Sequence, residues 1–317
     1  MYGYENYKKV KDAIEERRVS AIREADARNT ALRMESEEIR EIDRELVGTG
    51  LLIFKTACAG GDIAPIRERN TELMKRRKRE LCRLGYPEDY TEVKYSCPHC
   101  SDSGFVMDGA RMCACFREAL LKENIKSSGI GRLIEKQSFD NFSLEYYKGD
   151  EETLRRMERN LKMAKDFADN FAKHEENLLL IGKTGTGKTH LSTAIAKSVI
   201  ESGYEVLYDS TQNIVAAFEA DKFRSGYGSY EPQGDKYLEC DLLILDDLGT
   251  EMVTQFTVSC LYNLLNTRMN KGLKTVISTN LSPDELQRKY EDRIYSRIVG
   301  CGSRILLFGG EDRRLSV

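Results

Sequence analysis

The feature that most constrains this chain is a glycine-rich loop set between an apolar run and a helical segment. Residues 178–181 read Leu-Leu-Leu-Ile and lead directly into Gly-Lys-Thr-Gly-Thr-Gly-Lys-Thr at residues 182–189. In the pattern Gly-x-x-x-x-Gly-Lys-Thr the glycines let the backbone curl, so that successive N–H groups point at phosphate oxygens. The helix expected to start near Thr189 adds its positive N-terminal end. The loop therefore predicts a nucleoside triphosphate site at the end of a buried strand.

Two side chains of this loop have specific expected roles. Lys188 should reach the β- and γ-phosphates of ATP, and the Thr189 hydroxyl should ligate Mg²⁺. The predicted nucleotide-binding residues of the loop are Gly182, Lys183, Thr184, Gly185, Thr186, Gly187, Lys188 and Thr189.

Two later apolar runs end in polar residues that complete such a site. Residues 242–245 are followed by Asp246 and Asp247. We expect Asp246 to hold Mg²⁺ and Asp247 to orient or deprotonate the attacking water, whereas a pair of capping acids is the alternative. Residues 275–278 lead to Asn280, which is placed to contact the γ-phosphate or the nucleophilic water.

Arg293 and Arg297 lie four residues apart, which on a helix places both on one face. Exposed arginines are ordinarily only solvated. The position of this pair after the expected strand at residues 275–278 favours an arginine finger, a positive charge supplied to a neighbouring subunit's γ-phosphate in the transition state.

The spacing of short apolar runs predicts the fold class of residues 131–317. Five such runs are separated by helix-length segments, and this alternation indicates an α/β fold with a parallel sheet flanked by helices. The expected strands are residues 178–181, 206–208, 242–245, 275–278 and 305–308.

Residues 1–96 have a different character, with 20 Lys/Arg and 19 Asp/Glu. One narrow apolar stripe indicates a long helix that ends at Gly48 and Gly50, and a second helix is expected from Ile66 to Leu84. The stripe consists of Leu32, Ile39, Ile42 and Leu46, and Val10 and Ile14 precede it at helical spacing. We predict a helical hairpin or short coiled coil that also binds a partner, because so narrow a stripe needs another surface. The basic run at residues 75–79 is interpreted as a solvated helix face.

Residues 97–130 are predicted to form a small zinc-binding module. Two close cysteine pairs, Cys97 with Cys100 and Cys113 with Cys115, suit tetrahedral Zn²⁺, and a hairpin with an Asp-Gly turn is expected between them. Unpaired structural thiols are the alternative. His99 is an alternative ligand in place of one of the cysteines. Reduced thiols or metal ligands are favoured over disulfides, because the nine cysteines are an odd number without an export signal.

Overall charge and hydropathy exclude two classes of protein. The formal net charge of −3 excludes a histone-like nucleic-acid coat, so any DNA contact must come from a local surface. A mean hydropathy of −0.51, with no apolar run of membrane-spanning length, excludes an integral membrane protein. We expect a soluble, cytoplasmic protein.

With these residues in place, the chain from about Phe139 to Arg314 resembles the AAA+ ATPases of the DnaC/DnaI/IstB clade. The resemblance rests on residues 139–142 (Phe-Asp-Asn-Phe), 182–191, 245–249, 278–280 and 293–297. A cysteine insert followed by this ATPase is most similar to the DnaI-type replicative helicase loaders. The resemblance implies an AAA+ P-loop ATPase preceded by a helical N-terminal region and a zinc-binding insert.

The resemblance also implies roles for individual residues. Asn280 matches the first sensor residue of the family, and Arg313 matches the second sensor. Arg297 matches the arginine finger, and Arg293 is its neighbour. His190 follows the P-loop and joins the nucleotide-binding set. Contacts to single-stranded DNA are implied at Phe223, Thr254 and Phe256, where two aromatic rings suit base stacking; core packing of the two rings is the alternative. Asp247 stands where Glu is usual, which favours slow hydrolysis that acts as a switch.

Three functions remain open on these grounds. The first is a helicase loader that assembles as a homo-oligomer, binds the replicative DNA helicase through residues 1–130 and binds single-stranded DNA through its ATPase ring. The second is an IstB-type transposition helper that binds duplex DNA and stimulates a transposase. The third is an adaptor that binds ATP but barely hydrolyses it.

Overall fold

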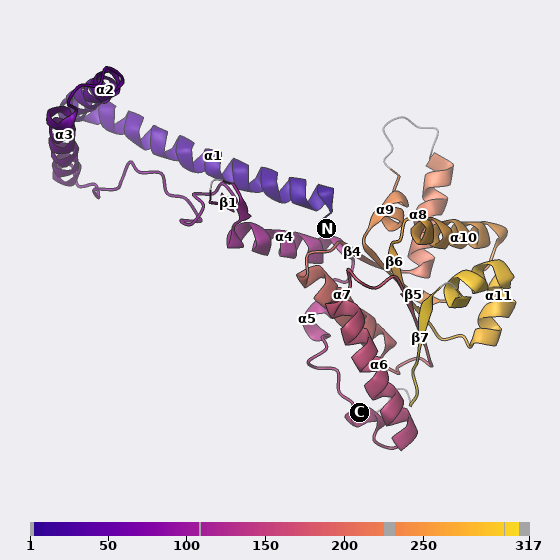
Figure 1. Cartoon of the computed structure of the whole chain (residues 1–317). Coiled ribbons are helices and arrows are strands. Elements are labelled where there is room, and N and C mark those ends of the chain that lie inside the picture. Colours follow the sequence, from indigo (N-terminus) through magenta and orange to yellow (C-terminus); the bar gives the residue numbers. More distant parts are fainter. Residues whose placement is uncertain (1–2, 108, 225–231, 301, 311–317) are drawn as a thin grey trace. The chain divides into compact units, whose positions relative to one another are not determined.

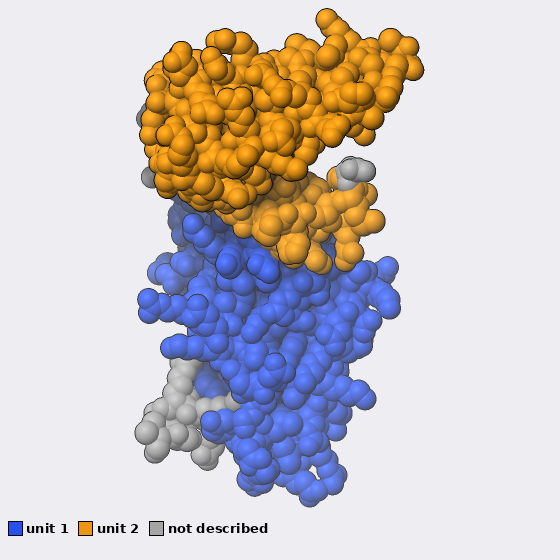
Figure 2. Space-filling view, turned by 90° about the vertical axis from the view of Figure 1, so that its left-hand side faces the viewer, with its two compact units in different colours: residues 1–8, 118–317 blue, residues 9–117 orange. Residues whose placement is uncertain are grey.

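The computed structural model describes residues 3–107, 109–224, 232–300 and 302–310. These fall into two compact units, coloured separately in Figure 2. We call residues 9–117 the N-terminal unit, and residues 1–8 with 118–317 the sheet unit. The predicted division at residues 96 and 130 stays a prediction. No helix in the described ranges is long and apolar enough to cross a membrane.

Three helices make up most of the N-terminal unit: α1 (Tyr4–Glu35), which begins in the sheet unit, α2 (Glu37–Cys58) and α3 (Ala64–Arg83). The prediction of one helix ending at Gly48 and Gly50 is wrong. The helix is interrupted at Ser36, whose hydroxyl accepts from the Ile39 N–H at 3.2 Å and caps α2. Both glycines lie inside α2, where each costs about 1 kcal/mol relative to Ala but does not end the helix.

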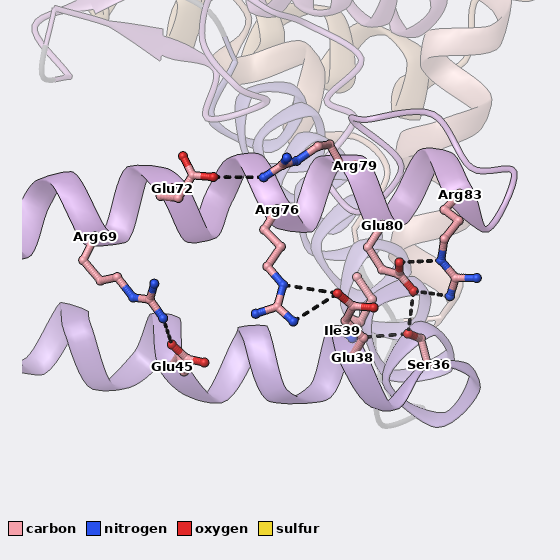
Figure 3. Close-up of polar contacts among 10 residues, drawn as sticks. All are labelled: Ser36, Glu38, Ile39, Glu45, Arg69, Glu72, Arg76, Arg79, Glu80 and Arg83. Carbon is pink, nitrogen blue, oxygen red and sulfur yellow. Dashed lines mark hydrogen bonds and ion pairs between the residues drawn. The ribbon is translucent and has the colours of Figure 1, made fainter.

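The predicted helical hairpin forms between α2 and α3, which run side by side in Figure 3. Arg69 pairs with Glu45 at 2.7 Å and Arg76 with Glu38 at 3.1 Å across the two helices. The apolar core beneath contains Leu32, Ile39 and Leu81. The unit continues into the hairpin of β1 (Phe105–Val106) and β2 (Arg111–Met112) and the start of α4 (Ala114–Ser127).

The sheet unit contains one parallel sheet of five strands in the order β4-β5-β6-β3-β7. All five expected strands form, although the last lies at residues 303–307 rather than 305–308. The remaining elements are, in chain order, α5 (Leu133–Lys136), η1 (Glu145–Tyr147), α6 (Glu151–Asp169), β3 (Asn177–Ile181), α7 (Lys188–Glu201), β4 (Val206–Ser210), α8 (Thr211–Arg224), α9 (Asp235–Glu239), β5 (Leu242–Leu248), α10 (Gln255–Asn270), β6 (Lys274–Thr279), α11 (Pro283–Tyr295), η2 (Ser296–Gly300) and β7 (Ser303–Leu307).

Helices cover both faces of this sheet (Figure 1). Because alternate residues of a strand face opposite ways, Leu178 and Leu180 pack with α6 and α7, whereas Leu179 packs with α8, α10 and α11. The predicted α/β architecture is confirmed. The carboxyl ends of β3, β5 and β6, which are neighbours in the sheet, therefore meet along one edge.

Candidate nucleotide site and cysteine cluster

The loop after β3 has the curled backbone that its glycines predict. Gly185 and Gly187 adopt positive φ angles of 76° and 95°, and α7 starts at Lys188. Gly182 has no room for a side chain, because a Cβ there would lie 2.6 Å from the Cβ of Phe308. The Tyr147 hydroxyl donates to the Thr186 carbonyl at 2.8 Å and holds the loop from outside. This conformation suits a phosphate cradle.

A cavity of about 420 Å³ opens beside this loop. It brings together the loop, the ends of β5 and β6, and the segment after α5. Its lining consists of Gln137, Thr184, Gly185, Gly187, Lys188, Thr189, His190, Asp247, Thr250 and Asn280. Sequence reasoning missed Gln137 and Thr250, because neither belongs to a motif whose chemistry singles it out.

Lys188 is buried, with 5% of its surface exposed. Its ammonium donates to the carbonyls of Gly182 at 2.6 Å and Lys183 at 2.9 Å, and to the amide oxygen of Asn280 at 2.7 Å. The structure therefore brings the predicted phosphate-binding lysine and the predicted sensor into direct contact.

The Asp246 carboxylate is buried and held by two hydroxyl groups. Tyr208 donates to one of its oxygens and Ser278 to the other. Burial, followed by the charge of Asp246, raises the pKa of Tyr208, which keeps its proton on the hydroxyl. A carboxylate and a hydroxyl are hard oxygen donors that fit Mg²⁺.

Asp247 sits in a bulge of β5. The strand register shifts between Leu245 and Leu248, and Asp247 adopts a left-handed φ of 53°. Its N–H donates to the Ser278 hydroxyl at 3.0 Å, while its side chain is exposed and lines the cavity. The bulge thus gives the second acid an environment different from the buried first acid, as separate roles require.

His190, near the start of α7, contacts the Phe-Asp-Asn-Phe segment at residues 139–142. Its Nε2 lies 3.0 Å from the Ser138 carbonyl and 2.9 Å from the Asn141 amide oxygen, and its ring meets Phe142 edge-on. Both polar partners are acceptors, so Nε2 carries the proton. Burial lowers the pKa of His190, which favours the neutral ring.

The two predicted finger arginines follow a break in α11 and do not share one regular helix face. Glu291 has φ 61° and ψ 165°, Arg293 lies in the last turn of α11, and Arg297 lies in the π-helical η2. Arg293 is exposed and Arg297 is half-buried, and neither lines the cavity described above. Arg313 lies outside the described residues.

The three predicted DNA contacts have different environments. Phe223 is 73% exposed, so the core alternative is wrong for this ring. Phe256 is half-buried, and the Lys222 ammonium lies 5.0 Å from its ring centroid. The Thr254 hydroxyl accepts from the Thr257 N–H at 3.1 Å and caps α10. A DNA-binding role for these residues stays a prediction.

In the N-terminal unit the four predicted zinc ligands converge. The Sγ atoms of Cys97, Cys100, Cys113 and Cys115 all lie within 4.8 Å of one another, with separations of 3.8 Å for Cys97–Cys113 and 3.5 Å for Cys100–Cys115. Tetrahedral Zn²⁺ with bonds of about 2.3 Å places its sulfurs about 3.8 Å apart. His99 is exposed and lies outside this group. The donor set and its spacing fit zinc.

Asp102 organises the turn after the first cysteine pair, a role that the sequence did not reveal. Its fully buried carboxylate accepts from the N–H groups of Ser96 at 2.7 Å and Cys97 at 2.9 Å, and pairs with Arg17 at 2.7 Å. Ser101 and Asp102 both have left-handed φ angles, 49° and 51°. The carboxylate therefore connects α1 to the cysteine cluster and fixes the backbone that presents Cys97.

Comparison with known proteins gives one family match and several similar proteins. Residues 143–299 match the family described as IstB-like ATP binding protein. The uncharacterized protein YdaV of Escherichia coli K12 is 28% identical over 207 residues, which cover 63% of this chain and 77% of YdaV. The replicative helicase loader DnaC of the same strain is 24% identical over 201 residues, 63% of this chain and 78% of DnaC. A crystal structure of the DnaC helicase loader aligns with 56% of this chain and with 98% of the DnaC chain in that structure. The sequence identity is 21% and the TM-score is 0.47.

Proposed function

Because residues 143–299 form an IstB-like ATP-binding domain homologous to the DnaC helicase loaders, we propose that this protein loads a replicative helicase onto single-stranded DNA in an ATP-dependent manner. The observation that carries the proposal is the gathering of Lys188, Asp247 and Asn280 around one cavity.

These residues support ATP hydrolysis as the underlying reaction. The loop N–H groups and Lys188 bind the phosphates, while Thr189 and Asp246 are the residues that would hold Mg²⁺. When bound, Mg²⁺ supplies positive charge against the phosphate oxygens. Asp247 orients or deprotonates the attacking water, and Asn280 contacts that water or the γ-phosphate. The shorter carboxylate of Asp247, compared with Glu, favours slow turnover, as suits a switch.

An exposed apolar surface of α2 supports a partner-binding role for residues 1–130. Val47, Leu51 and Phe54 follow one another at helical spacing and are 62%, 59% and 70% exposed. Solvent-exposed apolar side chains of this kind are typical of protein interfaces. We assign this surface to the replicative helicase.

The exposed ring of Phe223 and the Lys222–Phe256 pair support a contact with single-stranded DNA. An aromatic ring stacks on any base, and an ammonium close by neutralises phosphate. Such a contact needs no large net charge, in agreement with the value of −3 for the chain.

Capture of the purified replicative helicase by the full-length protein, with ATP and single-stranded DNA present, tests the proposal. We expect Phe54→Glu to lose the helicase but to keep ATP binding, whereas Met34→Glu, at an exposed position on α1, keeps both. Absence of a helicase complex for the unaltered protein would contradict the proposal. Preference for duplex DNA with stimulation of a transposase would favour the IstB-type helper instead.

A further inference from the structure

The Arg297 guanidinium is held on α10 by three hydrogen bonds. Nε and Nη2 both donate to the Asn266 amide oxygen, at 3.2 Å and 2.9 Å, and Nη2 also donates to the Tyr262 hydroxyl at 2.9 Å. The guanidinium carbon lies 4.1 Å from the centroid of the Tyr262 ring. A long, flexible side chain is thereby restricted to one orientation.

Every partner of this guanidinium is electrically neutral. Besides Asn266 and Tyr262, the only further acceptor within the described residues is the Arg293 carbonyl, which receives Nη1 at 2.9 Å. A carboxylate would hold an arginine more tightly but would also cancel most of its charge at short range. Four of the five N–H groups are used, so that one N–H of Nη1 and the whole positive charge are left for another acceptor.

Arg297 does not line the candidate nucleotide cavity of its own chain. The cavity beside the P-loop is lined by ten residues, and Arg297 is not among them. An oriented, unneutralised cation outside its own nucleotide site suits an anion on another molecule.

We propose that Tyr262 and Asn266 are positioning residues that present Arg297 to the triphosphate of a second copy of this chain. The inference rests on the proposed function, since it requires ATP hydrolysis in an assembly. Tyr262 fixes the plane of the guanidinium through its ring, and Asn266 fixes the rotation within that plane because one oxygen receives two of its N–H groups. Neutral acceptors keep the charge available for the transition state.

Mixed subunits test the inference. Arg297→Ala subunits keep their nucleotide cavity, and Lys188→Ala subunits keep Arg297, so neither should hydrolyse ATP alone while an equimolar mixture with single-stranded DNA should. Further changes are then made only in the Lys188→Ala subunits, whose own cavity is already inactive. We expect Asn266→Asp and Tyr262→Leu to lower the activity of the mixture at least about tenfold, without changing the KM for ATP.

Asn266→Asp separates positioning from a structural role. The carboxylate retains an acceptor for Arg297 and strengthens the contact, so a structural role predicts full activity, whereas our inference predicts a loss because the charge is neutralised. Asn263→Ala on the same helix, whose amide oxygen lies 3.5 Å from the Thr267 hydroxyl, is the matched control and should keep full activity. Thermal unfolding of each variant shows that it is folded.

The outcomes distinguish the two proposals. If the mixture with Lys188→Ala subunits regains no activity, then Arg297 does not act across subunits and this inference is wrong, whereas the proposed function is tested separately by capture of the helicase. The second case is that this mixture is active. If folded Lys188→Ala subunits that also carry Asn266→Asp or Tyr262→Leu then restore the same activity, only the positioning inference is overturned.

Discussion

The ammonium of Lys188 and the amide oxygen of Asn280 lie 2.7 Å apart, although 92 residues separate them in the sequence. The contact exists because β3 and β6 are parallel neighbours, with Ile181 opposite Thr279, so that the chain leaves both strands at the same edge. We therefore expect a phosphate bound by Lys188 also to contact Asn280. The pair connects nucleotide binding to the residue expected to detect the γ-phosphate.

We predict that Lys188→Ala and Asn280→Ala have different consequences. Lys188→Ala removes the buried cation and should weaken ATP binding more than about tenfold, because a charge-assisted contact to phosphate is lost. Asn280→Ala should leave ATP affinity within about threefold and lower hydrolysis about 100-fold, a typical loss for one transition-state contact. Titration with a fluorescent ATP analogue and a phosphate-release assay measure the two effects. Lys197→Ala, on α7 but outside the cavity lining, is the control, and equal behaviour of the two variants would contradict the assignment.

A second prediction concerns the left-handed backbone of Asp247. Asp247→Gly removes the carboxylate and relieves a conformation that costs a side-chain-bearing residue about 1 kcal/mol. We therefore expect higher thermal stability together with loss of hydrolysis and nearly unchanged ATP binding. Asp247→Asn should lose hydrolysis without the gain in stability. Turnover by either variant at the rate of the unaltered protein would remove Asp247 from the chemistry.

The parts of the site carried by local motifs could be predicted from the sequence. A buried strand followed by Gly-Lys-Thr, by Asp-Asp or by Asn is a short pattern, and parallel neighbours must place such strand ends together. Lys188, Asp247 and Asn280 consequently line one cavity as expected. The five strands were predictable for the same reason, since each is an apolar run between helices.

Residues whose importance depends on tertiary contacts could not be predicted. Tyr208 and Ser278 resemble ordinary strand residues, and only the pairing of β4 and β6 with β5 brings their hydroxyls to Asp246. The break at Ser36 was missed because the apolar stripe continues across it, with Leu32 and Ile39 packed in the same core. Periodicity reports which face is buried, not whether the helix axis is continuous.

We predict that the cysteine cluster holds about one zinc ion per chain and that the ion stabilises the N-terminal unit. Cys113→Ser removes a ligand from the group of four thiols, so it should lower the zinc content and the unfolding temperature of that unit. Cys82→Ser, at an exposed cysteine outside the group, should change neither. Metal analysis of the purified protein and thermal unfolding with and without a chelator are the measurements. A full zinc content in Cys113→Ser would exclude Cys113 as a ligand.

The last prediction concerns pH and the buried carboxylate of Glu80 (Figure 3). Hydrogen bonds from Arg83 at 2.7 Å and 2.6 Å, with one from Ser36 at 3.1 Å, lower the pKa of Glu80 below its ordinary value of 4.5. The folded state thus favours the charged form. Its stabilisation is complete above about pH 4.5 and is lost as the pH falls through the lowered pKa, where the folded carboxylate also becomes protonated.

Glu80→Gln should therefore destabilise the N-terminal unit by about 1 kcal/mol at pH 7, a modest value because Arg83 is largely exposed. The difference from the unaltered protein should shrink as the pH is lowered below about 4.5. Glu72→Gln is the matched control, because Glu72 pairs with Arg79 at 2.9 Å on the exposed surface of the same helix, where such a pair contributes little. Urea unfolding at a series of pH values measures both variants. A difference for Glu80→Gln that stays constant down to pH 3 would show that its carboxylate charge does not stabilise the junction of α2 and α3.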